Sequence, residues 1–185
     1  MELREVLKAR RSIRQYTGEA IPEDTIRDIL SYAPWVPNHH VSEPWRFVVA
    51  QGPSLEELAD LRHQAVLRRR AGEDSAQARA DKARQEFLDA SAVIAVIQRL
   101  DENSSRRQED YASVAMATYN IILAAWDAGI GAFWNTGPLM QDADVRAWLD
   151  LREDEQPAAF LRLGYPKAVP VQRRTPIDER VQWRR

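Results

Sequence analysis

The chain contains 185 residues with no cysteine, and its 26 basic and 28 acidic residues give a formal net charge of −2. This length is typical of one domain, here residues 1–185, whose core is large enough to need no disulfide or metal staple. The balanced charge disfavours nucleic acid and anionic membranes as partners, and the absence of cysteine excludes a disulfide framework, a thiolate nucleophile and a cysteine-ligated metal.

The first predicted element is an amphipathic helix over residues 2–10. Leu3, Val6 and Leu7 recur there at helical spacing, with charged residues between them. Because this segment has no apolar run of the signal-peptide type, we expect a cytoplasmic protein.

A basic turn follows the helix, with the sequence A-R-R-S-I-R-Q-Y at residues 9–16. A guanidinium group offers a planar fork of donors that matches phosphate or carboxylate oxygens, and a hydroxyl adds a directional donor. The turn therefore predicts an anion site, with a solvated basic surface as the alternative. Its candidate ligands are Arg10, Arg11, Ser12 and Arg14.

The next segment is predicted to hold a helix, a shaped loop and a strand. Pro22 opens the helix with acidic residues in the first turn, and two closely spaced prolines end it. From there to Pro44 the prolines prevent a regular helix or a central strand. Residues 45–51, W-R-F-V-V-A-Q, indicate a β-strand, and a helix is predicted over about 55–70.

The middle of the chain is predicted to contain an exposed helical excursion and a buried strand. Residues 68–86 are rich in charged residues, glutamine and alanine, which favours a helical and mostly exposed segment. The continuous apolar run at 91–98 is typical of a strand covered on both faces. Residues 101–109 are predicted to be a polar connector.

Residues 111–128 form an alanine-rich stretch that is apolar nearly all round. About 20 apolar residues can span a bilayer, but polar residues such as Asn120 make this stretch a poor membrane segment. A buried central helix is the prediction. Its small residues fit either a subunit interface or the core of a monomer.

The C-terminal part is predicted to hold two more strands and an extended basic tail. A short strand is expected at 130–134, a helix at 142–149, a buried strand at 158–163 and the tail at 167–185. Four strands separated by helices point to an α+β or α/β domain whose sheet is covered by helices, and some crossings are long enough for parallel pairing.

No set of residues for hydrolysis or metal binding stands out. No serine lies in the G-x-S-x-G setting of a nucleophile, and His39, His40 and His63 show no metal-ligand spacing. Neighbouring histidine side chains tend to diverge, so no metal is predicted. The chain also lacks a G-x-G-x-x-G or P-loop motif, so phosphate binding falls to side chains of the basic turn and of the pair Arg173 and Arg174. A protein without its own reactive groups often carries a cofactor, and we predict no catalytic side chain.

Four ordered motifs carry a family resemblance: R-R-S-I-R-Q-Y, A-P-W-V-P-N-H-H-V-S-E-P-W-R-F, G-I-G-A-F-W-N-T-G-P and L-R-L-G-Y-P. Together they resemble the nitroreductase family of FMN-dependent oxidoreductases, especially its compact bacterial members. The resemblance covers most of the chain and is weakest over residues 55–90. It implies an α+β three-layer sandwich, with a central, mainly antiparallel sheet flanked by helices, in an intertwined homodimer that holds FMN at the subunit interface.

The resemblance also implies a role for each residue of the basic turn. Arg10 and Ser12 would hold the phosphate and ribityl chain of FMN, and Arg11 would contribute through its backbone or an indirect contact. Arg14 would face the N1 and O2 edge of the flavin. A fixed cation is favourable there because the reduced flavin is stabilised as an anion.

Other site positions implied by the resemblance lie far from this turn in the sequence. Trp35 and His39 would reach the flavin of the partner subunit, and Arg174 would contact phosphate. Many family members have serine, asparagine and glutamine where this chain has His39, Val41 and Glu43, and the loss of asparagine at position 41 removes an amide that could contact the flavin. Trp35 could stack on a flat substrate or pack at the interface. The segment whose backbone would run along the ring near N5 consists of Trp134, Asn135, Thr136 and Gly137.

The implied function is hydride transfer from NADH or NADPH to FMN, followed by reduction of a small flat acceptor such as a nitroaromatic or quinone. Use of one pocket by both reactants predicts ping-pong kinetics. The alternatives are a relative that modifies the flavin or dehydrogenates another substrate, and a flavin-binding dimer without turnover.

Overall fold

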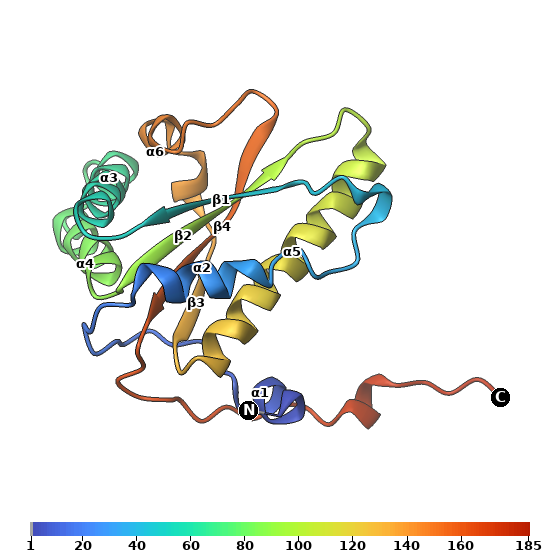
Figure 1. The fold of residues 1–185 in the computed structure, drawn as a ribbon. Helices are drawn as coiled ribbons and strands as arrows, with labels where there is room; N and C mark the ends of the chain where they lie inside the picture. The colour runs from blue at the N-terminus through green and yellow to red at the C-terminus, as the bar shows by residue number, and fades with distance from the viewer. Residues whose placement is uncertain (1) are drawn as a thin grey trace.

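The computed structural model describes residues 2–185 and shows an α+β fold of three layers (Figure 1). A four-stranded sheet forms the central layer, in the order β1-β2-β4-β3. Its strands are β1 (Trp45–Ala50), β2 (Ala92–Arg99), β3 (Gly131–Asn135) and β4 (Glu155–Gly164). All three neighbouring pairs are antiparallel, which confirms the expected fold class. The parallel pairing suggested by the long crossings does not occur between these strands.

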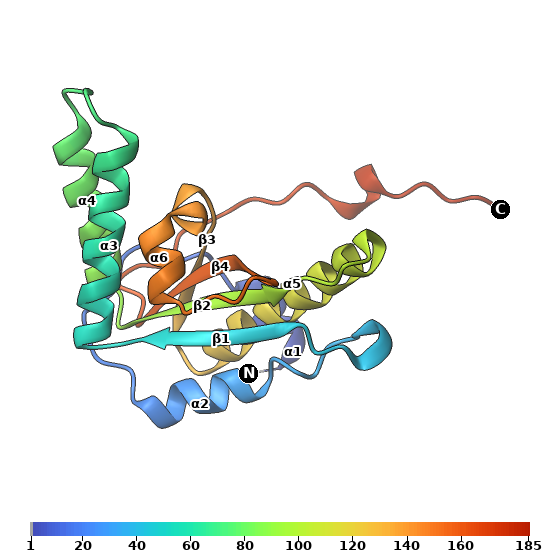
Figure 2. The ribbon, with the colours of Figure 1, turned by 90° about the horizontal axis from the view of Figure 1, so that it is seen from above.

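Helices α5 (Ser104–Asp127) and α2 (Glu23–Ser31) cover one face of the sheet, and Figure 2 shows α2 on the side opposite α6 (Ala143–Trp148). Alternate strand residues such as Ile94 and Leu161 point to this face, where they pack with Ile121 of α5. The period of two in the strands meets the apolar stripe of the helix, so one large core forms between these layers.

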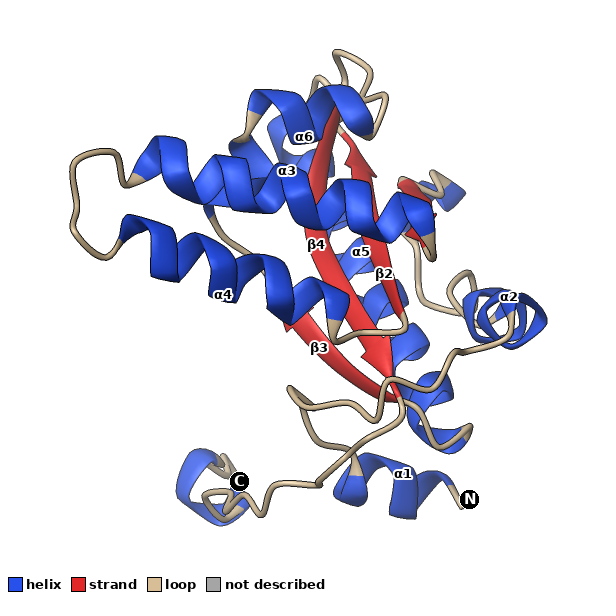
Figure 3. Ribbon diagram, turned by 90° about the vertical axis from the view of Figure 1, so that its left-hand side faces the viewer, coloured by secondary structure: helices blue, strands red, loops and turns tan. Residues whose placement is uncertain are grey.

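Helices α3 (Pro53–Arg69) and α4 (Ala76–Leu88) form a hairpin over the opposite face, together with α6. Figure 3 shows the hairpin crossing in front of the sheet and extending beyond it, with α5 behind. The remaining alternate strand residues, Ile97 and Phe160 among them, pack there against Leu58 and Phe87. The two cores make the buried strands apolar on both faces, as the unbroken apolar run of β2 predicts.

Two segments differ from the expectation. Residues 68–86 are mostly exposed, as predicted, but the chain turns at 70–75 and returns as α4, which buries Ala80 and Ala83. The expected connector at 101–109 is wrong because α5 begins at Ser104. The side chain of Asn103 caps this helix, since its Oδ1 accepts hydrogen bonds from the amides of the second and third residues after it. The start of the helix was not recognised in the sequence because its first turn is polar.

Helix α5 is buried on one side and exposed on the other. Val114, Ala117 and Ile121 are fully buried, whereas Tyr111, Met116 and Tyr119 keep 37% to 46% of their surface exposed. The stretch is thus a central helix, as expected, but it retains an uncovered apolar stripe. No helix among the described residues combines the length and apolarity that crossing a membrane requires.

The N-terminal helix packs on the body of the molecule, whereas the C-terminal tail extends away from it (Figure 1). Helix α1 (Leu3–Ala9) packs against α5. The tail at 167–185 is exposed and extended apart from the short helix η3 (Ile177–Arg180), and Figure 1 shows it running away from the sheet. The extended tail is therefore confirmed.

Candidate active site

The basic turn docks on the edge strand β3. The amide of Ile13 donates a hydrogen bond to the carbonyl oxygen of Ala132 at 3.0 Å, and Ser12 forms an isolated parallel bridge with the same residue. A Cβ at Gly131 would lie 2.4 Å from Cγ1 of Ile13, so only glycine permits this approach. Two segments that are about 120 residues apart in the sequence thereby become neighbours.

The ring of Phe133 contacts two guanidinium groups, one from the basic turn and one from β4. The Cζ atom of Arg14 is 4.6 Å from the ring centroid, and that of Arg162 is 4.7 Å from it. Cations are attracted to the negative face of an aromatic ring, so the ring holds both groups in place. Arg14 has no carboxylate partner among the described residues, which leaves its positive charge available to a ligand.

Arg162 is only 2% exposed although it carries a charge. Its Nε donates to Oδ1 of Asn135 at 3.0 Å, and its Nη1 donates to the carbonyl oxygen of Glu86 at 2.7 Å. Burial lowers the pKa of this guanidinium. The hydrogen bonds compensate for the lost water and tie the end of β3 to β4 and α4.

Arg10 and Arg11 point to different partners. The guanidinium of Arg10 lies 5.6 Å from the ring centroid of Tyr119 on α5, and its Nε is buried without a hydrogen-bond partner among the described residues. Arg11 instead donates from Nη1 to the carbonyl oxygens of Lys8 and Arg10, at 2.7 and 2.9 Å, and so caps the end of α1. Ser12 is exposed beside them. Arg10 thus offers a free donor, whereas the Arg11 side chain is used within the chain.

The four positions expected near N5 lie at the end of β3 and in the turn after it, and their side chains point to different sides of the sheet. The side chain of Trp134 packs in the core on the α5 side of the sheet. Asn135 and Thr136 point to the α3 side, where they line a cavity. Gly137 has a φ of 129°, a conformation that other residues rarely adopt. Because these side chains diverge, only the backbone of residues 134–137 forms a continuous surface through all four positions.

The cavity has a volume of about 490 Å³ and lies between α3, β4 and the short helix η2 (Pro138–Gln141). Part of its wall is apolar, with Val66, Phe87, Leu139 and Phe160. The rest includes four arginines of α3 and the turn after it: Arg62, Arg68, Arg69 and Arg70. Sequence reasoning missed this group and Arg162. The available signals were the R-R-R run at 68–70 and the arginine that interrupts the apolar residues at 157–163 of β4.

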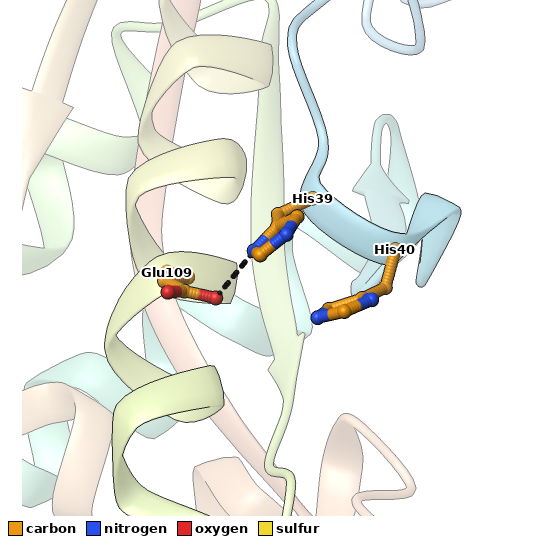
Figure 4. A group of neighbouring side chains, drawn as sticks. All are labelled: His39, His40 and Glu109. Atoms are coloured by element: carbon orange, nitrogen blue, oxygen red, sulfur yellow. Dashed lines mark hydrogen bonds and ion pairs between the residues drawn. The ribbon is translucent and has the colours of Figure 1, made fainter.

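The loop that carries Trp35 and His39 lies on the other side of the molecule from this cavity, against α5. The side chain of Trp35 is 82% exposed. Figure 4 shows His39 and His40 of the short helix η1 (His39–Val41) side by side, with His39 pointing to Glu109 on α5. Nδ1 of His39 is 2.8 Å from Oε2 of Glu109, and the two imidazole centroids are 3.9 Å apart.

The expectation that the two histidines diverge is wrong. Their rings stack because His40 and Val41 have φ values of 63° and 51°, which fold the loop back on itself. His39, His40 and Glu109 offer ligand atoms within 4.8 Å of one another, but all three side chains are exposed. Exposed groups of this kind commonly gather without a cation, so we assign no metal to them.

A hydrogen-bonded network fixes this loop to α5. The side-chain Nδ2 of Asn38 donates to the hydroxyls of Ser42 and Ser113, both at 3.2 Å. The Oδ1 atom of Asn38 accepts from the backbone amide of Glu43 at 2.8 Å. Ser42 in turn donates to Oδ1 of Asp110 at 2.6 Å. These hydrogen bonds join the loop to α5 of the same chain, so the fold itself holds Trp35 and His39 in outward-facing positions.

The structure therefore brings some of the expected site residues together and leaves others apart. Ser12 and Arg14 lie beside β3, and Arg10 lies nearby against Tyr119 of α5. His39 contacts Glu109, which is ten residues before the Tyr119 that Arg10 approaches, a separation of about 15 Å along a helix. Arg174 lies in the exposed tail and makes no hydrogen bond or ion pair with another residue from 2 to 185.

Residues 7–165 match the Nitroreductase family. A Bacillus subtilis protein named "Putative NAD(P)H nitroreductase YfhC" is 32% identical over 180 residues, which cover 96% of this chain and 92% of that protein. The Escherichia coli K12 protein "Putative NAD(P)H nitroreductase YdjA" is 30% identical over 168 residues, or 90% of each chain.

A solved structure has the same fold over nearly the whole chain. The nitroreductase-like family protein from Bacillus cereus superposes with a TM-score of 0.88 and 29% identity, covering 99% of this chain and 96% of its own. The fold and these similarities define the protein as an oxidoreductase with a three-layer α+β sandwich. The chain belongs to the nitroreductase family.

Proposed function

We propose that this protein is an FMN-dependent oxidoreductase that takes hydride from NADH or NADPH and passes electrons to a small flat acceptor, such as a nitroaromatic or a quinone. The observation that carries the proposal is the docking of the basic turn on β3, where Ser12 pairs with Ala132 and the guanidinium of Arg14 lies 4.6 Å from the ring centroid of Phe133. The names of the relatives in Bacillus subtilis and Escherichia coli support a nicotinamide donor.

The residues of the basic turn fit the phosphate end of FMN. Arg10 has a buried Nε without a partner, and an unsatisfied buried donor costs about 1–3 kcal/mol. A phosphate oxygen would accept this hydrogen bond and add the attraction of opposite charges. The exposed hydroxyl of Ser12, two residues further along the chain, supplies a second donor, while Arg11 holds the turn by capping α1.

Arg14 supplies the charge at the ring end of the site. Bound FMN would provide the hydride acceptor and electron donor, which the side chains of this protein lack. Arg14 is held by the ring of Phe133 and not by a carboxylate, so its charge is fixed but not neutralised. A fixed cation at the pyrimidine edge stabilises the negative charge of the reduced state.

The turn after β3 is expected to orient the reactants. Arg162 holds the side chain of Asn135, and the unusual backbone of Gly137 allows close approach of a flat ring to the main chain. Neither Asn135 nor Gly137 needs to exchange a proton. This fits a site in which the chain positions the reactants and excludes water.

We propose further that two copies of this single domain form a cytoplasmic homodimer with FMN at their interface. Apolar side chains face outward where a second copy would cover them. Trp35 and Val41 are 82% and 78% exposed, and α5 carries the uncovered stripe described above. In this assembly Trp35 and His39 would reach the flavin of the partner, and the tail would bring Arg174 to a phosphate.

The absorption spectrum of the purified protein tests the proposal. We expect a yellow protein that bleaches with NADPH or NADH without oxygen and regains its colour when a nitroaromatic or quinone is added. A colourless protein that takes up no added FMN would overturn the proposal. A yellow protein that neither nicotinamide bleaches would instead be a flavin-binding dimer without turnover. Initial rates should follow ping-pong kinetics, and a ternary complex would contradict the use of one pocket by both reactants.

A further inference from the structure

The cavity beside α3 contains four arginines, and acidic residues neutralise three of them. Arg68 pairs with Asp142 and Asp144, with N–O distances of 2.8 and 2.9 Å. The other two ion pairs join Arg70 to Glu73 at 2.8 Å and Arg62 to Glu86 at 2.7 Å.

Arg69 is the arginine of this cavity that remains unpaired. It forms no hydrogen bond or ion pair with any residue in the described part of the chain, and it lies on the exposed side of α3 where it lines the cavity. A single unpaired cation among three neutralised neighbours gives the cavity a local positive charge. This charge favours a ligand that carries an anionic group.

Arg62 adds a buried donor to the same cavity. Its guanidinium lies 4.3 Å from the ring centroid of Phe87, and only its Nη2 is bonded to Glu86. Its Nη1 is buried and has no acceptor among residues 2–185. Burial lowers the pKa of this guanidinium. A donor that is shielded from water and lacks a partner is satisfied when a ligand oxygen enters.

The cavity adjoins the segment that we expect beside the flavin. Asn135 and Thr136 form part of its wall, and both belong to the segment 134–137 whose backbone is proposed to run along the ring. The apolar wall made by Val66, Leu139 and Phe160 is suited to a flat hydrocarbon ring. A reactant lying over the flavin could therefore place its ring near residues 135–136 and its charged group near α3.

We propose that this cavity binds an oxyanion, a carboxylate or a phosphate, carried by a reactant of the flavin, with Arg69 as the main cation and Arg62 as the buried donor. The reaction named in this inference rests on the proposed function. The presence of the anion site does not depend on that function. The oxyanion has two sources: a carboxylate on the electron acceptor, or the ribose phosphate that distinguishes NADPH from NADH.

Binding without turnover provides the first test. Oxidised, FMN-loaded protein is titrated with benzoate and with benzamide, a neutral analogue of the same shape, and the flavin spectrum reports binding. We expect benzoate to bind more tightly, and Arg69→Gln to reduce its affinity on the order of tenfold while the affinity for benzamide stays unchanged. Arg69→Lys should retain part of the preference, and added salt should weaken only the binding of benzoate.

Kinetics separate the two sources of the oxyanion. The kcat/KM ratio of para-nitrobenzoate to para-nitrobenzamide falls in Arg69→Gln if the acceptor supplies the carboxylate. The kcat/KM ratio of NADPH to NADH falls if the dinucleotide supplies the phosphate. Lys82→Gln is the matched control, because Lys82 is an exposed cation of α4 in the same hairpin and does not line the cavity.

Two outcomes overturn the inference. If Arg69→Gln changes neither the preference for benzoate nor either kinetic ratio, Arg69 is an ordinary solvated cation. If Arg69→Gln loses FMN, the cavity serves the cofactor and not a reactant. Failure of the wild-type protein to turn over any acceptor would count against the proposed function, whereas the benzoate titration would still report on the anion site.

Discussion

Arg162 on β4 donates a hydrogen bond from Nε to Oδ1 of Asn135, at 3.0 Å, and so joins the interior strand of the sheet to the end of its edge strand. The bond fixes the orientation of the Asn135 side chain, because Oδ1 faces Arg162 and the amide nitrogen faces away from it. A buried arginine thereby positions a residue that lines the cavity and lies in the proposed flavin segment.

Replacing Arg162 by methionine is expected to destabilise the fold. The variant keeps an unbranched apolar stem but removes the guanidinium, which leaves Oδ1 of Asn135 and the carbonyl of Glu86 without their donors. We expect a loss of about 1.5–3 kcal/mol in the free energy of unfolding, measured by urea denaturation. Arg79→Met, at an exposed position of α4, should change it by less than about 0.5 kcal/mol. Equal midpoints for the two variants would show that the buried bonds contribute nothing.

Replacing Arg10 by alanine is expected to release FMN. The substitution removes the buried Nε that has no partner within the chain and the charge that would attract the phosphate. Flavin content per chain, read from the absorbance ratio of flavin to protein after gel filtration, should fall severalfold. Arg4→Ala, at an exposed site of α1, is the control. Unchanged flavin content in Arg10→Ala would remove Arg10 from the phosphate site.

Replacing Arg14 by glutamine should change the redox properties of the flavin more than its affinity. The cation held over Phe133 favours the reduced, negatively charged state over the oxidised one. A loss of about 1.4 kcal/mol in this preference lowers a two-electron potential by about 30 mV. A potentiometric titration measures the shift, and Arg14→Lys should retain most of the wild-type potential. An unaltered potential in Arg14→Gln would refute the electrostatic role.

The ion pair between Arg46 and Glu155 is expected to make stability depend on pH. Glu155 is 4% exposed and accepts hydrogen bonds from Nε and Nη2 of Arg46 at 3.0 and 2.6 Å, and from the amide of Arg152 at 3.1 Å. The hydrogen bonds from Arg46, opposed by burial, hold the pKa of Glu155 below its ordinary value of 4.5. The ionised carboxylate therefore favours the folded state.

The sign of this linkage defines the experiment. A depressed pKa in the folded state stabilises the protein above about pH 4.5, and the contribution is lost as the pH falls through the lower, folded value. Glu155→Gln should lower the free energy of unfolding by about 1–3 kcal/mol at neutral pH, and the difference from wild type should close in acid. Glu153→Gln, at an exposed neighbouring position, should match the wild type at every pH. A gap for Glu155→Gln that stays constant with pH would contradict the linkage.

The sequence predicted most of the elements because each has a local signature. The apolar run of β2 and the apolar stretch of α5 are visible in consecutive residues, since burial on one or both faces sets their periodicity. The start of α5 was missed because its first turn is polar and its cap, Asn103, also suits a loop. The turn at 70–75 was missed because charged residues continue on both sides of it.

The sequence by itself determined the basic turn, the positions of the strands and the membership of a family, because these depend on residues that are close together in the chain. Only the tertiary structure decided which distant groups meet. The antiparallel pairing of β3 with β4 brings Arg162 to Phe133, and the docking of the basic turn on β3 brings Arg14 to the same ring. The packing of α3 on α4 and α6 pairs Arg62 with Glu86 and Arg68 with Asp142, while Arg69 stays unpaired. Such pairings depend on how separate layers pack, and no local pattern of residues specifies that packing.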